Sequence, residues 1–301
     1  MAMLKLLSGM AVLIAACGSA HAQDSDVAAD SETEADDTDG AWQVGIIGGV
    51  TLIEGGDNQP YGGVSLTRDI GSGHVGVSAI YVDAGRSGGI LSPVSAKTYQ
   101  LNLSAGNKWG DFSVDGYVSY GKRKFAVEQI ATQAQRIRVT SKGDSFGVGA
   151  SLSYDIALSD TVVISPALGL DYDRVEIVIN ANSQQQQNAT ILQKEKGVTG
   201  NAGIDASLFF GEDGRHIAGI SAYGFNSSNG NAYSGVGAGT RVMRVLAARN
   251  GAGGADSWGE IGALASFALS DALRLQMGVT RTLGFSGGEV TSLISGLQIR
   301  F

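Results

Sequence analysis

Few residues of this chain could perform chemistry, and their spacing indicates no known kind of catalytic centre. Downstream of the first 22 residues there are two histidines, His74 and His216, each expected at the start of a strand beside a short turn. No group of His, Cys, Asp or Glu has the spacing that is typical of a metal site. We therefore predict a protein that is not an enzyme, with no catalytic residue, no cofactor and no metal ion.

Charged side chains that alternate with apolar ones form a second set of candidates. On the polar side of extended segments they could form ion pairs that keep an interior hydrated and rigid, or they could set ion selectivity if a pore is open. Asp171 and Asp173 could also act as paired carboxylates, but neighbouring positions on one polar face explain them. The set consists of Lys108, Asp115, Asp155, Asp171, Asp205, Arg274 and Arg300.

The elements that would position these side chains have a period of two. In Ser145–Ile156, Phe146 and Val148 begin an apolar face that continues to the end of the segment, while small and polar residues occupy the other face. Alternation of this kind predicts β-strands with two different sides. The same pattern recurs in Tyr99–Lys108, Phe112–Gly121, Asn201–Phe210, Ile261–Leu269 and Leu273–Thr280.

Three features favour a membrane environment over a soluble sandwich. The segments are longer than the usual strand of about five or six residues. Their polar face carries small residues, Asn and Asp rather than many Lys and Glu, which suits a wet interior. Aromatic residues lie near segment ends, as in the girdles of membrane barrels: Trp109, Phe112, Tyr120, Tyr154, Tyr172, Phe210 and Tyr223. Because lipid offers no hydrogen-bond partners, a spanning sheet must close on itself. We predict an all-β fold, a transmembrane antiparallel β-barrel.

Loop lengths predict the topology. Short turns are expected near Ile70–Gly73, Asn107–Gly110, Leu158–Asp160, Gly211–Gly214 and Leu269–Asp271. Long connections are expected near Glu54–Pro60, Asp83–Ala96, Ala126–Lys142, Asn180–Lys196 and Leu283–Gly288. Counting the strand-like Gly239–Arg249 gives thirteen strands. Assigning Asn226–Asp256 to one large outer loop restores the alternation of short periplasmic and long outer connections and gives about twelve.

The N-terminal region differs from the rest. Residues 1–22 combine a basic start, an apolar run and the small-residue ending Ala20-His21-Ala22, which predicts a cleaved signal peptide. The sequence of Ile14–Cys17 also resembles a lipoprotein processing site, so lipidation of Cys17 stays open. Residues 23–40 are a strongly acidic segment that is expected to be disordered. The barrel is assigned to residues 41–301, which have nearly no net charge and no basic patch for nucleic acid.

Several stretches resemble the twelve-stranded translocator (β) domain of autotransporters, namely Tyr99–Phe125, Gly143–Ile177 and the terminal Ser-Gly-Leu-Gln-Ile-Arg-Phe. The resemblance implies an integral protein of the Gram-negative outer membrane, with outer-membrane lipid as its surroundings. It also implies that the barrel assembly machinery reads the last strand, where Leu297, Ile299 and Phe301 would be the assembly signal. About eighteen residues precede the barrel, so little passenger is expected for secretion. The alternative function is a small porin-like channel for polar solutes.

Overall fold

The computed structural model describes most of the chain downstream of residue 39. It covers residues 40–54, 58–84, 96–125, 128–131, 136–183, 188–211, 214–230, 232, 254–286 and 288–301. The leader, the acidic segment and the strand-like Gly239–Arg249 lie outside these ranges. Within the described ranges, no helix is long and apolar enough to cross a membrane.

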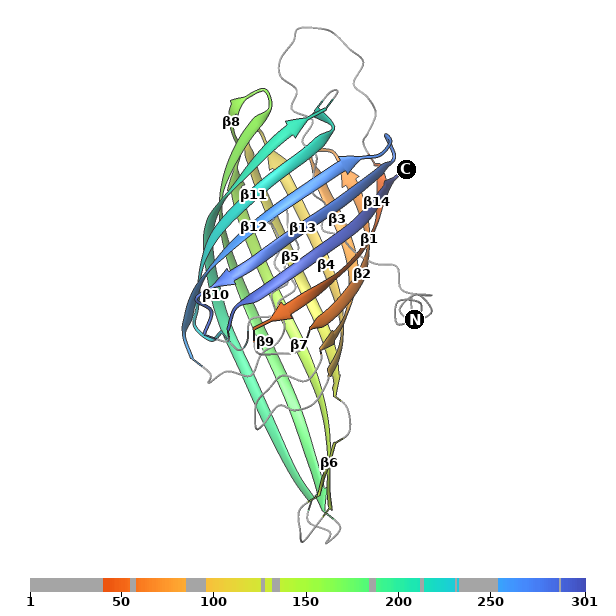
Figure 1. The fold of residues 1–301 in the computed structure, drawn as a ribbon, viewed down its shortest axis with the longest axis vertical. Helices are drawn as coiled ribbons and strands as arrows, with labels where there is room; N and C mark the ends of the chain where they lie inside the picture. The colour runs from red at the N-terminus through yellow and green to blue at the C-terminus, as the bar shows by residue number, and fades with distance from the viewer. Residues whose placement is uncertain are drawn as a thin grey trace.

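Antiparallel strands make up the described chain and form a closed barrel (Figure 1). The strands are β1 (Trp42–Ile53), β2 (Gln59–Ile70), β3 (Gly73–Ala84), β4 (Ala96–Trp109), β5 (Phe112–Phe125), β6 (Glu128–Ala131), β7 (Arg136–Tyr154), β8 (Ile156–Ser159), β9 (Val162–Ser183), β10 (Asn188–Phe210), β11 (His216–Ser227), β12 (Asp256–Ala268), β13 (Leu273–Leu283) and β14 (Val290–Arg300). Each pairs with its neighbour, and β1 pairs with β14 from Gln43 opposite Arg300 to Ile53 opposite Val290. That last pairing closes the barrel.

The number of strands around the barrel is twelve, which confirms the prediction. Of the fourteen described strands, β7 and β8 are one barrel strand interrupted at Asp155, since both pair with β9. The short strand β6 pairs with residues 136–139 at the beginning of β7 and is not one of the strands of the barrel wall.

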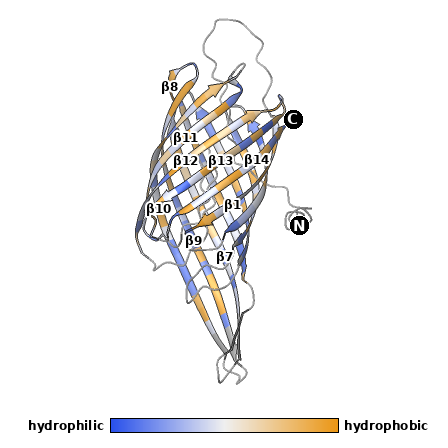
Figure 2. Ribbon diagram, viewed as in Figure 1, coloured by the Kyte–Doolittle hydropathy of each residue, from blue (hydrophilic) through white to orange (hydrophobic). Residues whose placement is uncertain are grey.

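The two faces of the wall have opposite character. Leu168 and Leu170 are 60% exposed and Ile220 is 67% exposed, all on the outer face. On the inner face, Thr199 and Asp173 are only 2% exposed. Hydrophobic and hydrophilic residues accordingly alternate along the strands (Figure 2). An exterior of large apolar side chains is suited to lipid, because no polar group there needs a hydrogen-bond partner.

Three inward tyrosines pack across glycines on the neighbouring strand. A Cβ atom on each of these glycines would lie 2.3–2.5 Å from an atom of the tyrosine ring, so only glycine leaves room for the ring. Each hydroxyl then donates to an acceptor, namely the Leu293 carbonyl, Asp171 or Asp205. The cross-strand pairs are Tyr61 with Gly49, Tyr117 with Gly149, and Tyr223 with Gly203.

One of these tyrosines corrects a prediction. Tyr223 was expected in an aromatic girdle near a strand end, but it is buried inside the barrel and hydrogen-bonded to Asp205. The tyrosine lies on the inward parity of β11, opposite Gly203. Trp109 and Phe112, in contrast, are exposed at the end of the barrel where β4 turns into β5, as expected of a girdle.

Two of the expected long connections are largely strand. The region Asn180–Lys196 forms the far ends of β9 and β10, which pair from Leu208 opposite Val162 to Asn188 opposite Asn182. The region Ala126–Lys142 contains β6 and the beginning of β7. These strands project from the barrel at the end opposite the C-terminus (Figure 1). Backbone pairing across β7, β9 and β10 extends the sheet beyond the wall, so these polar segments form strands rather than loops.

Interior polar groups and the closing strand as candidate functional site

Lys108 and Asp155 form an ion pair inside the barrel, near the end with the short turns. The Lys108 Nζ atom lies 3.2 Å from Asp155 Oδ2. The Ser165 hydroxyl donates to the other carboxylate oxygen, and the backbone N–H of Asp155 donates to the Asp111 carbonyl at 2.8 Å. Asp155 lies between the end of β7 and the beginning of β8. Its contacts therefore connect this interruption of the strand to Lys108 of β4 and Ser165 of β9.

A second polar group crosses the seam between the first and last strands. Gln43 Nε2 donates to Asp69 Oδ2 at 2.8 Å, and Arg300 Nη2 lies 3.7 Å from the same oxygen. Gln298 in turn donates to the Gln43 side chain. These contacts join β14, β1 and β2, so the interior side of the seam is held by side chains as well as by the backbone ladder.

Two buried carboxylates accept hydrogen bonds from tyrosines at mid-barrel. Tyr117 donates to Asp171 Oδ1 at 2.9 Å, and Asn201 Nδ2 lies 3.4 Å from Asp171 Oδ2. Tyr223 donates to Asp205. Asp171 is 5% exposed and Asp205 is 8% exposed. A buried carboxylate needs such partners, because burying an unpaired charge costs several kcal/mol.

The remaining predicted charges and the histidines have structural neighbours. His74 Nε2 lies 3.7 Å from Asp115 Oδ1 on the inner face. Arg274 donates to the Ser266 hydroxyl at 3.2 Å. His216 Nδ1 accepts a hydrogen bond from the backbone N–H of Ala268 at 3.2 Å.

The seven predicted charges therefore lie on the inner face, but in separate groups rather than one site. Their roles, rigid ion pairs or a selectivity filter, stay predictions. Sequence reasoning did not single out the inward Asp69, Arg123 and Glu260, although the alternation of Ser65, Thr67 and Asp69 with apolar neighbours could have revealed the first of them.

A possible nucleophile motif also escaped the sequence reasoning. The pattern Gly-x-Ser-x-Gly occurs at residues 143–147 and again at 284–288. Ser145 lies inside β7, and the second copy lies in the connection between β13 and β14. A nucleophile elbow requires a sharp turn from a strand into a helix. Neither copy has that context, so neither indicates a catalytic serine.

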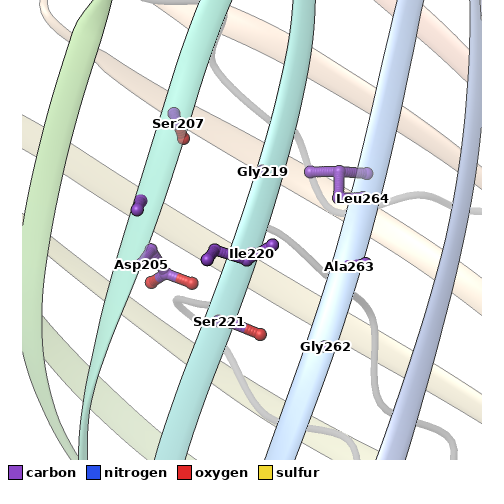
Figure 3. A pocket seen from close by; sticks show the side chains of 9 residues that line it. Asp205, Ser207, Gly219, Ile220, Ser221, Gly262, Ala263 and Leu264 are labelled. Carbon is purple, nitrogen blue, oxygen red and sulfur yellow. The ribbon is translucent and has the colours of Figure 1, made fainter.

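The hollow that lies against Asp205 is too small for a substrate. It is bordered by Asp205 and Ser207 of β10, Gly219 and Ser221 of β11, and Gly262 of β12 (Figure 3). Its volume is about 10 Å³, which is at the lower limit for one water molecule. In the described part of the chain, no three His, Cys, Asp or Glu residues are grouped so that they could hold a metal ion.

The last strand presents an apolar edge to the outside. Leu297, Ile299 and Phe301 lie on its outer face, and Phe301 is 70% exposed. The backbone of Phe301 exchanges two hydrogen bonds with Trp42, at 2.8 and 2.9 Å. The terminal residue is thus paired through its backbone while its ring stays accessible. Its role as an assembly signal stays a prediction.

Residues 20–280 match the family model described as "Autotransporter beta-domain". The chain belongs to this family. No curated protein sequence matches it.

Solved autotransporter β-domains have the same fold. The translocator domain of autotransporter NalP from Neisseria meningitidis is 16% identical with a TM-score of 0.60, over 88% of this chain and 90% of that one. The β-domain of the Bordetella autotransporter BrkA is 13% identical, also with a TM-score of 0.60, over 86% of this chain and 98% of that one. The protein is an integral outer-membrane β-barrel of the autotransporter-translocator type, and this family is a non-enzymatic barrel.

Proposed function

We propose that this autotransporter-type barrel acts in the outer membrane as a translocator-like envelope component and carries out no catalysis. The observation that supports this most directly is the closure of β1 onto β14 around a polar, paired interior, with an apolar exterior. In such a barrel no strand edge is exposed to lipid. The relative from Neisseria meningitidis is itself a translocator domain.

Export and assembly belong to the same proposal. Residues 1–22 would be removed after Ala22, and the barrel assembly machinery would recognise the strand that ends in Phe301. Mass spectrometry of the protein from outer membranes tests the first step. A mature N-terminus at Gln23 supports cleavage after Ala22. A diacylglycerol-modified Cys17 at the N-terminus would contradict it and indicate lipoprotein processing instead.

A closed interior is favoured over an open channel. The inward carboxylates Asp171, Asp173 and Glu260 are at most 5% exposed, whereas the lining of a wide aqueous pore would be in contact with water. Purified barrel in a planar bilayer should therefore show no steady conductance. A steady open conductance would instead favour the porin-like alternative.

The absence of catalysis is tested separately. The purified, folded barrel should show neither lipase nor protease activity. An activity that disappears in a His74→Ala or Ser145→Ala variant, with folding unchanged, would contradict this part of the proposal.

A further inference from the structure

Exposed basic side chains gather on the outer face at one end of the barrel. Lys97 of β4, Lys122 and Lys124 of β5, and Lys142 of β7 form one part of the group. Arg174 of β9 and Lys194 and Lys196 of β10 form the other. These residues are called the basic rim. Hydrophilic positions on β7, β9 and β10 are visible where these strands leave the barrel (Figure 2).

Strand register places basic residues opposite one another within each part of the basic rim. Lys97 lies opposite Lys124, and Lys124 lies opposite Lys142. Arg174 lies opposite Lys196. Residues directly opposite each other in antiparallel strands point to the same side and lie about 4.5–5.5 Å apart, where like charges destabilise the sheet. A surface with this many close like charges therefore favours an anionic partner.

Three carboxylates on the same face offset only part of this charge. Asp83 lies opposite Lys97, and Asp144 lies opposite Lys122. Glu176 pairs with Arg174, and Lys194 Nζ lies 3.0 Å from Glu176 Oε1. The hydrogen bonds from Arg174 and Lys194 lower the pKa of Glu176, so it stays ionised. Asp144 accepts a hydrogen bond from Tyr120 at 3.1 Å. The other basic residues of the rim keep the surface positive.

The height of the basic rim corresponds to the lipid headgroups. On β4 the outer face runs from Trp109 at one end to Tyr99 at the other, and Lys97 is the next outward residue. Ten residues at about 3.4 Å each, tilted by about 45°, span about 24 Å, close to the apolar band of about 25 Å in outer-membrane barrels. Lys97 then lies just beyond the aromatic girdle.

The opposite wall lacks such a group among its described residues. At the same end of the barrel, the outward Arg281 of β13 is paired with Glu289, and the residue that follows β1 is the exposed Glu54. The basic rim is therefore confined to β4, β5, β7, β9 and β10. This asymmetry argues against a general attraction to the membrane surface and for a bound lipid.

An outer hollow adjoins the basic rim. It has a volume of about 960 Å³ and includes the outward Leu168, Val198 and Leu283 in its lining. Gly200 also lines the hollow, and a Cβ atom on it would meet nothing within 4 Å. The surface of the wall is therefore recessed at this position. Val198 is two residues from Lys196 on the same face of β10. A cationic edge beside an apolar trough fits an amphiphile with an anionic head and acyl chains.

We propose that the basic rim binds the phosphate groups of a phosphorylated, acylated glycolipid of the outer leaflet, the class that contains lipid A, with an acyl chain in the adjoining hollow. Arg174 can engage a phosphate through its planar guanidinium, and the lysines act as point charges. This inference rests on the proposed function, because it needs the projecting strands to lie at the cell surface.

Binding is tested with the full chain, purified and folded in nonionic detergent micelles. Bisphosphorylated lipid A is titrated against the wild type and against a variant with Lys122→Gln, Lys124→Gln, Lys194→Gln and Lys196→Gln, with bound lipid counted by native mass spectrometry. The four substitutions should weaken binding at least tenfold. The matched control Arg281→Gln, an outward residue on the opposite wall, should bind as the wild type does.

Further measurements keep the proposal falsifiable. Wild-type affinity should fall with rising salt, and lipid A without its phosphates should bind at least tenfold more weakly. Equal binding of dephosphorylated lipid A, equal binding by the fourfold variant, or equal binding of phosphatidylglycerol vesicles would each overturn the assignment. If the fourfold variant fails to fold, the salt series and the dephosphorylated lipid decide the matter on the wild type alone.

Failure of the underlying function has a different signature. A cysteine replacing Lys194 should react with an impermeant thiol reagent on intact cells. Labelling only after envelope rupture would overturn the cell-surface location, and with it the proposal, even if lipid A bound in micelles. Surface labelling without phosphate-dependent binding would overturn the glycolipid assignment alone.

Discussion

The contact between Tyr117 and Gly149 allows a sharp test of how the interior is held. The two residues lie directly opposite each other on β5 and β7. In a Gly149→Ala variant the new Cβ atom would lie 2.1 Å from Asp171 Oδ1 and 2.5 Å from Tyr117 Cε1. Real Cβ atoms do not approach other atoms so closely, so the ring or the carboxylate must move. Either movement breaks the 2.9 Å hydrogen bond between them.

The expected cost follows from that bond. A hydrogen bond to a charged group contributes about 1.5–3 kcal/mol. Forcing a side chain out of its packed rotamer adds about 1–3 kcal/mol. We therefore expect Gly149→Ala to lower the free energy of unfolding by about 3–5 kcal/mol, less if the buried Asp171 finds another partner.

The assay is urea unfolding of the refolded barrel in detergent, followed by tryptophan fluorescence. Gly200→Ala is the matched control, because its Cβ atom meets nothing within 4 Å, and its stability should stay within about 0.5 kcal/mol of the wild type. In a Tyr117→Ala background, Gly149→Ala should cost much less than in the wild type. An equal cost in both backgrounds, or a neutral Gly149→Ala, would refute the reasoning.

Three further predictions concern the seam, the interior ion pair and the orientation. Phe301→Ala keeps the backbone hydrogen bonds to Trp42, so it should refold in detergent with stability within about 1 kcal/mol of the wild type but reach the outer membrane in lower yield; normal yield in cells would contradict the signal role. Lys108→Met leaves the Asp155 carboxylate without its cation, so we expect a loss of about 1–3 kcal/mol in urea unfolding, and Lys108→Met with Asp155→Leu should recover part of it; no recovery would show that the pair is not the cause. A cysteine at Ser159 should react with an impermeant reagent only after envelope rupture, and labelling on intact cells would reverse the assigned orientation.

The inside and outside of the wall could be predicted from the sequence because the pattern depends only on parity. Phe146 and Val148 face out, while Gly147 and Gly149 face in, and the structure has the same arrangement. Lipid on one side and polar partners on the other leave each strand one acceptable orientation. The number of strands could be predicted because short periplasmic turns and long outer connections alternate along the chain.

Other features depend on contacts between strands and could not be predicted in this way. A tyrosine of an aromatic girdle and an inward tyrosine that packs on a glycine have the same sequence pattern, a tyrosine near the end of an alternating segment. The prediction for Tyr223 was therefore wrong. Only the register of β11 against β10 puts Gly203 beneath its ring. In the same way, Asn180–Lys196 is polar enough to predict a loop, but pairing with β7 and across the β9–β10 hairpin makes it sheet.

The lysines of β4 and β5 show why a residue type alone does not define a role in such a wall. Lys108 faces inward near one end and is matched by Asp155. Lys122 and Lys124 face outward at the other end, at and beyond the level of Tyr99, on a surface that has fewer carboxylates than cations. Parity decides whether a charge must find its partner within the protein, and height decides whether lipid headgroups can supply one. A matched interior and a rim with an excess of cations are the arrangement expected if the interior serves stability and the rim serves binding.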